Sequence, residues 1–89
     1  MTYSVWNFSI TLIRDNDNNN IVDVTPKLIT KVALTNDIKG VSDIETVKMD
    51  IIIDVETNTC IKDAITGFIS ADNEAEAQKI LFDYSDTLY

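Results

Sequence analysis

Histidine is absent from this 89-residue chain, and glycine and cysteine are scarce. Without histidine, neither the Ser-His-Asp nor the Cys-His arrangement of nucleophilic enzymes can be built. The two glycines, Gly40 and Gly67, lie too far apart to form the glycine-rich loops that bind nucleotide phosphates. These absences exclude the common catalytic signatures, and we expect a protein that is not an enzyme.

The single cysteine, Cys60, excludes a disulfide within the chain and a metal site built from cysteine and histidine. We therefore expect neither a cofactor nor a bound metal. A lone thiol is typical of proteins in a reducing compartment. No stretch approaches the ~20 apolar residues of a membrane span, and the first residues have neither the basic start nor the apolar run of a signal peptide. We expect a cytoplasmic protein.

Seven basic and fifteen acidic residues give the chain a net charge of −8. Nucleic acid and anionic membrane surfaces repel such a protein, so we expect it to bind neither directly. A basic partner, above all a protein that itself binds nucleic acid, would be attracted. The alternative is that the charge serves only to keep a small protein in solution.

Hydrophobic residues make up 45% of the chain, as in folded globular proteins, and the length predicts one domain over residues 1–89. Residues 3–14 alternate between apolar and polar, with these side chains on one face: Trp6, Phe8, Ile10 and Leu12. A period of two predicts a half-buried strand, and it places Trp6 in the core and not at a binding surface.

Three further strands are expected. Residues 44–57 alternate most clearly, and residues 60–70 form a run that a short helix would also fit. Residues 25–37 are ambiguous, because Thr25-Pro26 resembles a helix start whereas the β-branched residues that follow favour a strand, which we prefer. Polar segments separate these elements, at 15–20, 36–43 and 58–59.

The last segment predicts an amphipathic helix of about 12 to 15 residues. Asp72 is the expected cap, and Glu74 and Glu76 follow where the helix dipole favours negative charge. The apolar stripe is formed by Ala77, Ile80, Leu81, Tyr84 and Leu88. Short connections favour antiparallel pairing of the strands. The sequence therefore predicts an α+β fold, in which a small antiparallel sheet of about four strands has one C-terminal amphipathic helix packed on one face.

The segment RDNDNNNIVD, residues 14–23, has features of a calcium-binding loop. Asp15, Asp17 and Asn19 match the first, third and fifth positions of an EF-hand loop, and Asp23 matches the ninth. At the twelfth position, however, Pro26 stands where the bidentate glutamate belongs. We prefer a mobile hairpin turn, since Asp and Asn bind their own backbone and tolerate left-handed angles. A weak calcium site of another type is the alternative.

Acidic residues lie along the third expected strand. Alternate strand residues are about 6.6–6.8 Å apart on one face, which is on the order of the phosphate spacing along a nucleic-acid strand. Such a row fits a basic groove built for a phosphate backbone, although Lys48 and Ile52 interrupt it. The predicted partner-binding residues are Asp43, Glu45, Asp50, Asp54 and Glu56. An ordinary solvent-exposed sheet face is the alternative.

These patterns support two hypotheses about function. The first is a non-enzymatic interaction protein that imitates nucleic acid and occupies the basic surface of a nucleic-acid-binding protein. In size, charge and lack of histidine the chain resembles phage-encoded inhibitors of this kind, such as anti-restriction and anti-CRISPR proteins. The second is a structural or assembly subunit, for example a virion component, that self-associates through strand faces or edges. It is supported by apolar residues on the outer strand faces: Tyr3, Val5, Ile13 and Ile52.

Overall fold

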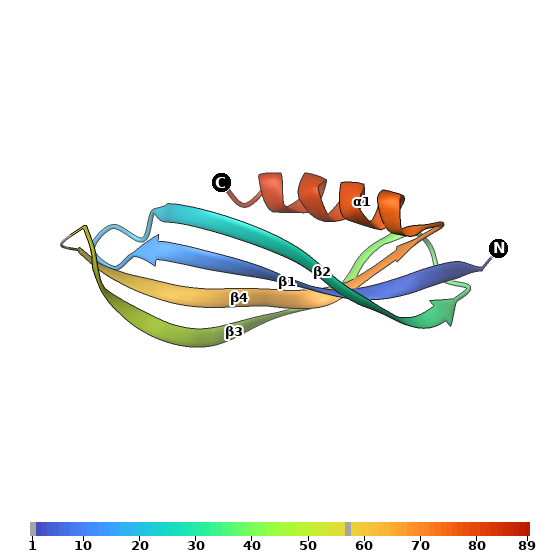
Figure 1. Ribbon diagram of the computed structural model, residues 1–89, viewed down its shortest axis with the longest axis horizontal. Helices are drawn as coiled ribbons and strands as arrows, with labels where there is room; N and C mark the ends of the chain where they lie inside the picture. Colours follow the sequence, from blue (N-terminus) through green and yellow to red (C-terminus); the bar gives the residue numbers. More distant parts are fainter. Residues whose placement is uncertain (1, 57) are drawn as a thin grey trace.

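The computed structural model describes residues 2–56 and 58–89, apart from the side chains of residues 54 and 55. The described chain forms four strands and then one helix (Figure 1), which are β1 (Tyr3–Asp15), β2 (Ile21–Thr35), β3 (Gly40–Val55), β4 (Asn58–Ala71) and α1 (Glu74–Asp86). The predicted α+β fold is confirmed. Residues 25–37 and 60–70, for which a helix was the alternative, belong mainly to strands, as preferred.

The four strands form one antiparallel sheet in the order β2-β1-β4-β3. The central strands, β1 and β4, pair in unbroken register from Ser4 opposite Ala71 to Asp15 opposite Cys60. β2 and β3 are therefore the two edges of the sheet. Pro26 lies within β2, where its missing N–H is tolerated because an edge strand has neighbours on one side only.

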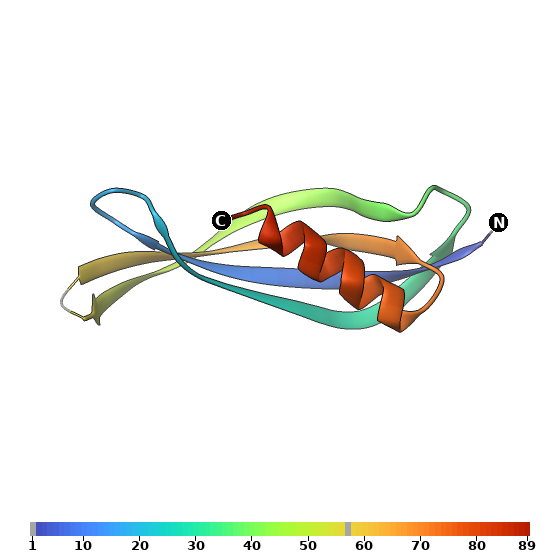
Figure 2. The ribbon, with the colours of Figure 1, turned by 90° about the horizontal axis from the view of Figure 1, so that it is seen from above.

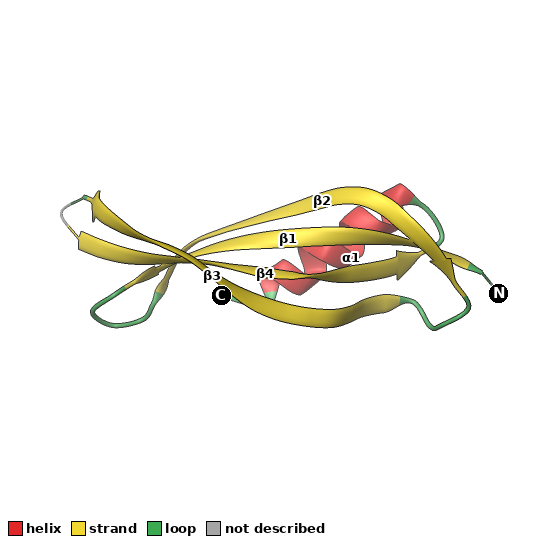
Figure 3. Cartoon of the chain, turned by 90° about the horizontal axis from the view of Figure 1, so that it is seen from below, coloured by secondary structure: helices red, strands yellow, loops and turns green. Residues whose placement is uncertain are grey.

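The two faces of the sheet differ. The helix face carries the β1 residues that the alternation placed together: Trp6, Phe8, Ile10 and Leu12. They are buried with β4 side chains beneath α1, whose Ala77 and Leu81 have no exposed surface. Full burial of a leucine-sized side chain stabilises a fold by about 1.5–3 kcal/mol. The core role predicted for Trp6 is confirmed. We call the opposite face, which Figure 3 shows from below, the open face.

The helix covers only part of this elongated molecule, whose longest extent is 50 Å. In Figures 1 and 2, α1 lies over the half of the sheet that contains the start of β1. The ends of the β1–β2 and β3–β4 hairpins extend beyond the C-terminal end of α1. Both edges of the sheet therefore run past the helix.

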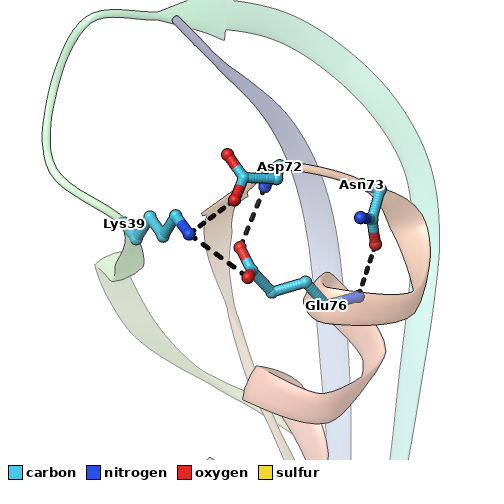
Figure 4. Close-up of polar contacts among 4 residues, drawn as sticks. All are labelled: Lys39, Asp72, Asn73 and Glu76. Carbon is cyan, nitrogen blue, oxygen red and sulfur yellow. Dashed lines mark hydrogen bonds and ion pairs between the residues drawn. The ribbon is translucent and has the colours of Figure 1, made fainter. Parts of the chain in front are cut away.

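Four residues hold the start of α1 in place (Figure 4). The Asn73 side chain accepts a hydrogen bond from the backbone N–H of Glu76 at 2.9 Å, which makes Asn73 the N-cap. The Glu76 carboxylate accepts one from the backbone N–H of Asp72, also at 2.9 Å. Lys39, from the β2–β3 loop, pairs with Asp72 at 2.5 Å and with Glu76 at 3.2 Å. The hydrogen bond to Asp72 and, to a smaller extent, the hydrogen bond to Glu76 raise the pKa of Lys39.

The prediction that Asp72 caps the helix is wrong by one residue. Asp72 precedes the cap, and its carboxylate binds Lys39 instead of a helical N–H. Asn and Asp are equally good caps, so local preference does not separate the two neighbours. The ion pair with a residue far away in the sequence decides between them.

Gly67 is a point of close packing between β4 and its neighbours. A Cβ atom at this position would lie 2.9 Å from Phe8 Cε2 and 2.9 Å from the Ser42 carbonyl oxygen. The Phe8 ring, which is 1% exposed, therefore occupies the space that a side chain at position 67 would need. The glycine inside this strand therefore marks close packing between β4 and its neighbours.

The Gly67→Ala variant should be destabilised by about 1–3 kcal/mol, because the new methyl group overpacks against Phe8 and a backbone carbonyl. Urea unfolding, followed by tryptophan fluorescence, measures the change in midpoint. An unchanged midpoint would show that the space beside Phe8 is not filled.

The Asn73→Ala variant should lose about 1 kcal/mol of stability because the first turn of α1 loses its cap. Asn73→Ser should retain most of it, since serine also caps. Asp72→Ala is the control, and it should cost less than Asn73→Ala because it removes only an exposed ion pair. The reverse order of the two alanine variants in urea unfolding would return the cap to Asp72.

Candidate interaction surface

The alternation predicted for residues 44–57 is broken by register shifts in β3. The pairing with β4 shifts between Ser42 and Glu45, between Lys48 and Asp50, and between Ile53 and Val55. An extra residue at each shift moves the side chains that follow to the other face of the sheet. The expectation that residues 44–57 alternate without interruption is therefore wrong, and plain alternation does not show which acidic side chains share a face.

Cross-strand partners show which face each acidic residue occupies, since directly opposed residues share a face. Glu45 lies opposite Thr66, and Asp50 lies opposite Lys62. Thr66 and Lys62 lie opposite Ser9 and Ile13 of β1, which alternate with the helix-face residues of that strand, and so lie on the open face. Lys48 instead lies opposite Asp63 on the helix face. Lys48 and Asp50 thus lie on opposite faces, although plain alternation places them together.

The other predicted partner-binding residues occupy less regular positions. Asp43 has a left-handed φ of 51° at the first register shift, and Glu56 has a φ of 53° in the β3–β4 turn. The side chain of Asp54 lies outside the described residues. Of the five, the structure brings Asp43 and Glu45 together and leaves Asp50 farther along the open face.

Asp43 and Glu45 line a hollow of about 300 Å³ in the open face. Thr66 and Phe68 of β4 line it beside them, and Ile29 of β2 contributes from the other edge. The β1–β2 register is also irregular here, where the Asn7 side chain accepts a hydrogen bond from the Thr30 N–H at 2.9 Å. Irregularities in both edge strands therefore accompany a hollow that spans the width of the sheet.

The edges carry most of the exposed large apolar side chains of the described chain. On β2 these are Val22, Ile29, Val32 and Leu34. On β3 they are Ile44, Val47, Met49, Ile51 and Ile53. By contrast, Val5 is 9% exposed, and Ile13 and Ile52 are half-buried. Apolar surface is thus present, as the second hypothesis requires, but mainly on residues that alternation alone did not select.

The polar loop at residues 15–20 is a hairpin turn, as expected. The Asp15 and Asn18 side chains accept hydrogen bonds from the N–H groups of Asp17 and Asn20, at 2.8 and 2.9 Å. The Arg14 guanidinium donates to Asn19 Oδ1 at 2.8 Å. Side-chain oxygens considered as calcium ligands therefore bind the loop itself. Within residues 2–56 and 58–89, no group of three acidic, cysteine or histidine residues is placed to hold a metal ion.

One acidic residue is used inside the fold. Asp63 is 5% exposed on the helix face and forms an ion pair with Arg14, which is partly buried. This pair links β4 to the end of β1 where the polar loop begins. Because a buried carboxylate needs its cation, Asp63 serves the fold and is not available to a partner.

No protein-family model, curated protein or solved structure matches this chain. Among the described residues, α1 is the one helix, and it is neither long nor apolar enough to cross a membrane. From the exposed apolar side chains and the hollow, the candidate interaction surface consists of the two sheet edges and the acidic hollow of the open face.

Proposed function

We propose that this chain is a non-enzymatic, cytoplasmic assembly subunit that joins other protein chains through the exposed edges of its sheet. The observation that carries the proposal is the combination, on β2 and β3, of long edge strands and exposed apolar side chains. An edge strand offers a row of backbone N–H and C=O groups to another strand, and such strand addition is a common mode of protein recognition. The single, buried cysteine is compatible with the reducing cytoplasm.

The apolar residues of β3 indicate where pairing would be strongest. The register shifts leave two regular stretches, 45–48 and 50–53. The second carries Ile51 and Ile53, which are 64% and 80% exposed. Each would contribute about 1.5–3 kcal/mol if fully buried against a partner. Apolar side chains this exposed on an edge strand promote aggregation of a monomer, whereas in an assembly they are buried against the partner.

The variant Ile51→Lys/Ile53→Lys should lose assembly, because it removes the exposed apolar side chains that a partner would bury and puts charges in their place. The apparent size of the tagged chain, pure and in cell lysate, is compared by size-exclusion chromatography. The control is Phe82→Lys, which replaces an apolar residue that is 51% exposed on α1. Wild type should run larger than a monomer in at least one setting, and only the β3 variant should revert. A wild-type monomer in both settings contradicts the proposal.

A second candidate function, imitation of nucleic acid, is supported by the acidic hollow. The Asp43 and Glu45 carboxylates lie at one side of it, and Phe68 and Ile29 supply apolar lining. This combination suits a lysine or arginine side chain, whose stem packs on apolar surface while its head pairs with carboxylate. The net charge of −8 would steer a basic, nucleic-acid-binding protein toward the chain.

For this second function, Asp43→Lys/Glu45→Lys should lose binding to a basic protein. Immobilised protein captures partners from nuclease-treated host lysate, and a salt gradient elutes them for mass spectrometry. Asp83→Lys/Asp86→Lys on α1 makes the same change in net charge at a distance from the hollow. Wild type and the α1 variant should both capture a salt-eluted nucleic-acid-binding protein. Equal capture by all three proteins would eliminate the hollow as its site.

A further inference from the structure

The two edges of the sheet are aligned with each other through rows of directly opposed residues. Ser9 of β1 lies opposite Lys27 on one side and Thr66 on the other, and Thr66 lies opposite Glu45. One row therefore crosses the whole sheet on the open face: Lys27, Ser9, Thr66 and Glu45. A basic residue on edge β2 and an acidic residue on edge β3 thus lie at the same level and on the same face.

The strand directions permit one copy of the chain to continue the sheet of another. All three neighbouring pairs are antiparallel, so β2 and β3 run in opposite directions. A second copy that continues the same sheet, with its helix on the same face, would bring its β2 antiparallel to β3 of the first. If the second copy is not shifted along the strand direction, Lys27 on its β2 would also lie opposite Glu45 on β3 of the first copy.

The charges of the edges favour this arrangement over pairing of like edges. β2 carries two lysines and one aspartate, whereas β3 carries four acidic residues and one lysine. Pairing β3 with β3 of another copy would set acidic strand against acidic strand, and directly opposed like charges are destabilising. Pairing β2 with β3 sets a basic edge against an acidic one.

Neighbouring rows support the same register. The row through Arg14 ends in Ile21 on β2, which is half-buried, and in Ile51 on β3, which is exposed, so these two isoleucines would meet. The row through Thr11 similarly sets Thr25 against Val47. A row with like charges at its ends runs through Ile13 and comprises Asp23, Ile13, Lys62 and Asp50. In this row Lys62 lies directly opposite Asp50 and offsets the repulsion between Asp50 and Asp23 of the next copy.

The helix leaves room for such stacking. Four strands occupy about 19 Å in the direction of stacking, whereas a helix is about 10 Å wide. Sheet twist would turn successive copies by roughly 80–100°, which moves their helices apart. Pairing β2 of one copy with β3 of the next leaves a free β3 edge at one end and a free β2 edge at the other. Further copies can therefore add, which leads to a ring or a filament and not to a closed two-fold dimer.

We propose that the partner chain is a second copy of this protein and that copies pair head to tail, with β2 of one on β3 of the next and Lys27 facing Glu45. The inference rests on the proposed assembly function and specifies its partner and register. Backbone pairing on either side of Pro26, which has no N–H to donate, and apolar contacts supply most of the affinity, and the Lys27–Glu45 pair selects the register.

A charge-swap cycle on the purified protein tests the register. Lys27→Glu and Glu45→Lys should each weaken self-association about three- to tenfold, since each turns an attractive pair into a repulsive one. Lys27→Glu/Glu45→Lys in one chain should recover near wild-type association, as should an equimolar mixture of the two single variants. Sedimentation velocity over a range of concentrations up to ~1 mM measures these constants. Lys79→Glu and Glu74→Lys, both exposed on α1, are the matched controls and should not show this coupling.

The outcomes separate this inference from the proposed function. If Glu45→Lys alters association but Lys27→Glu does not, and the double variant equals Glu45→Lys, copies pair β3 to β3 and the inference is overturned. Independent, additive effects of the two changes overturn the Lys27–Glu45 register. If the pure protein is monomeric at every concentration yet forms a β3-dependent complex in lysate, the edge function stands with a foreign partner and self-pairing is overturned.

Discussion

The structure depends on the antiparallel pairing of β1 with β4. This pair runs without a register shift from Ser4–Ala71 to Asp15–Cys60, while both outer pairs are irregular. It joins residues from opposite ends of the chain, so its entropy cost must be met by the core that it creates. That core is the helix face beneath α1, where Phe8 fits against Gly67 and Leu81 is fully buried. The regular centre also sets the cross-strand rows that align one edge of the sheet with the other.

The irregular outer pairs account for the features of the surface. Register shifts in β3 place Lys48 and Asp50 on opposite faces and Glu45 and Asp50 on the same face. The same shifts bring Asp43 and Glu45 to a hollow in the open face. Shifts also shorten the regular stretches that an edge can offer, which natural sheets use to limit unwanted pairing. An edge that is interrupted in this way is more selective about the register of its partner.

Charge and apolar surface act together on these edges. In the proposed assembly, exposed isoleucines on β3 would provide the area that a partner buries, and the acidic residues beside them would favour a basic partner. A basic edge strand and a basic groove are both compatible with that charge. The edge strand is favoured because β2 of this chain already has the required charge, direction and alignment through Lys27.

The amino-acid sequence by itself determined the four strands, the C-terminal helix and the helix face, because periods of two and 3.6 record which side chains must leave water. It also located the polar turn at residues 15–20, through residues that bind their own backbone. Only the tertiary structure decided that β2 and β3 are edges, that Asp63 is buried against Arg14, that Asn73 and not Asp72 caps α1, and that Lys27 and Glu45 share a row. The physical reason is that the spacing of apolar residues shows which side chains share a face of a strand or helix, but not which element lies beside it. Strand order, register shifts and ion pairs between distant residues arise from pairing across the sheet.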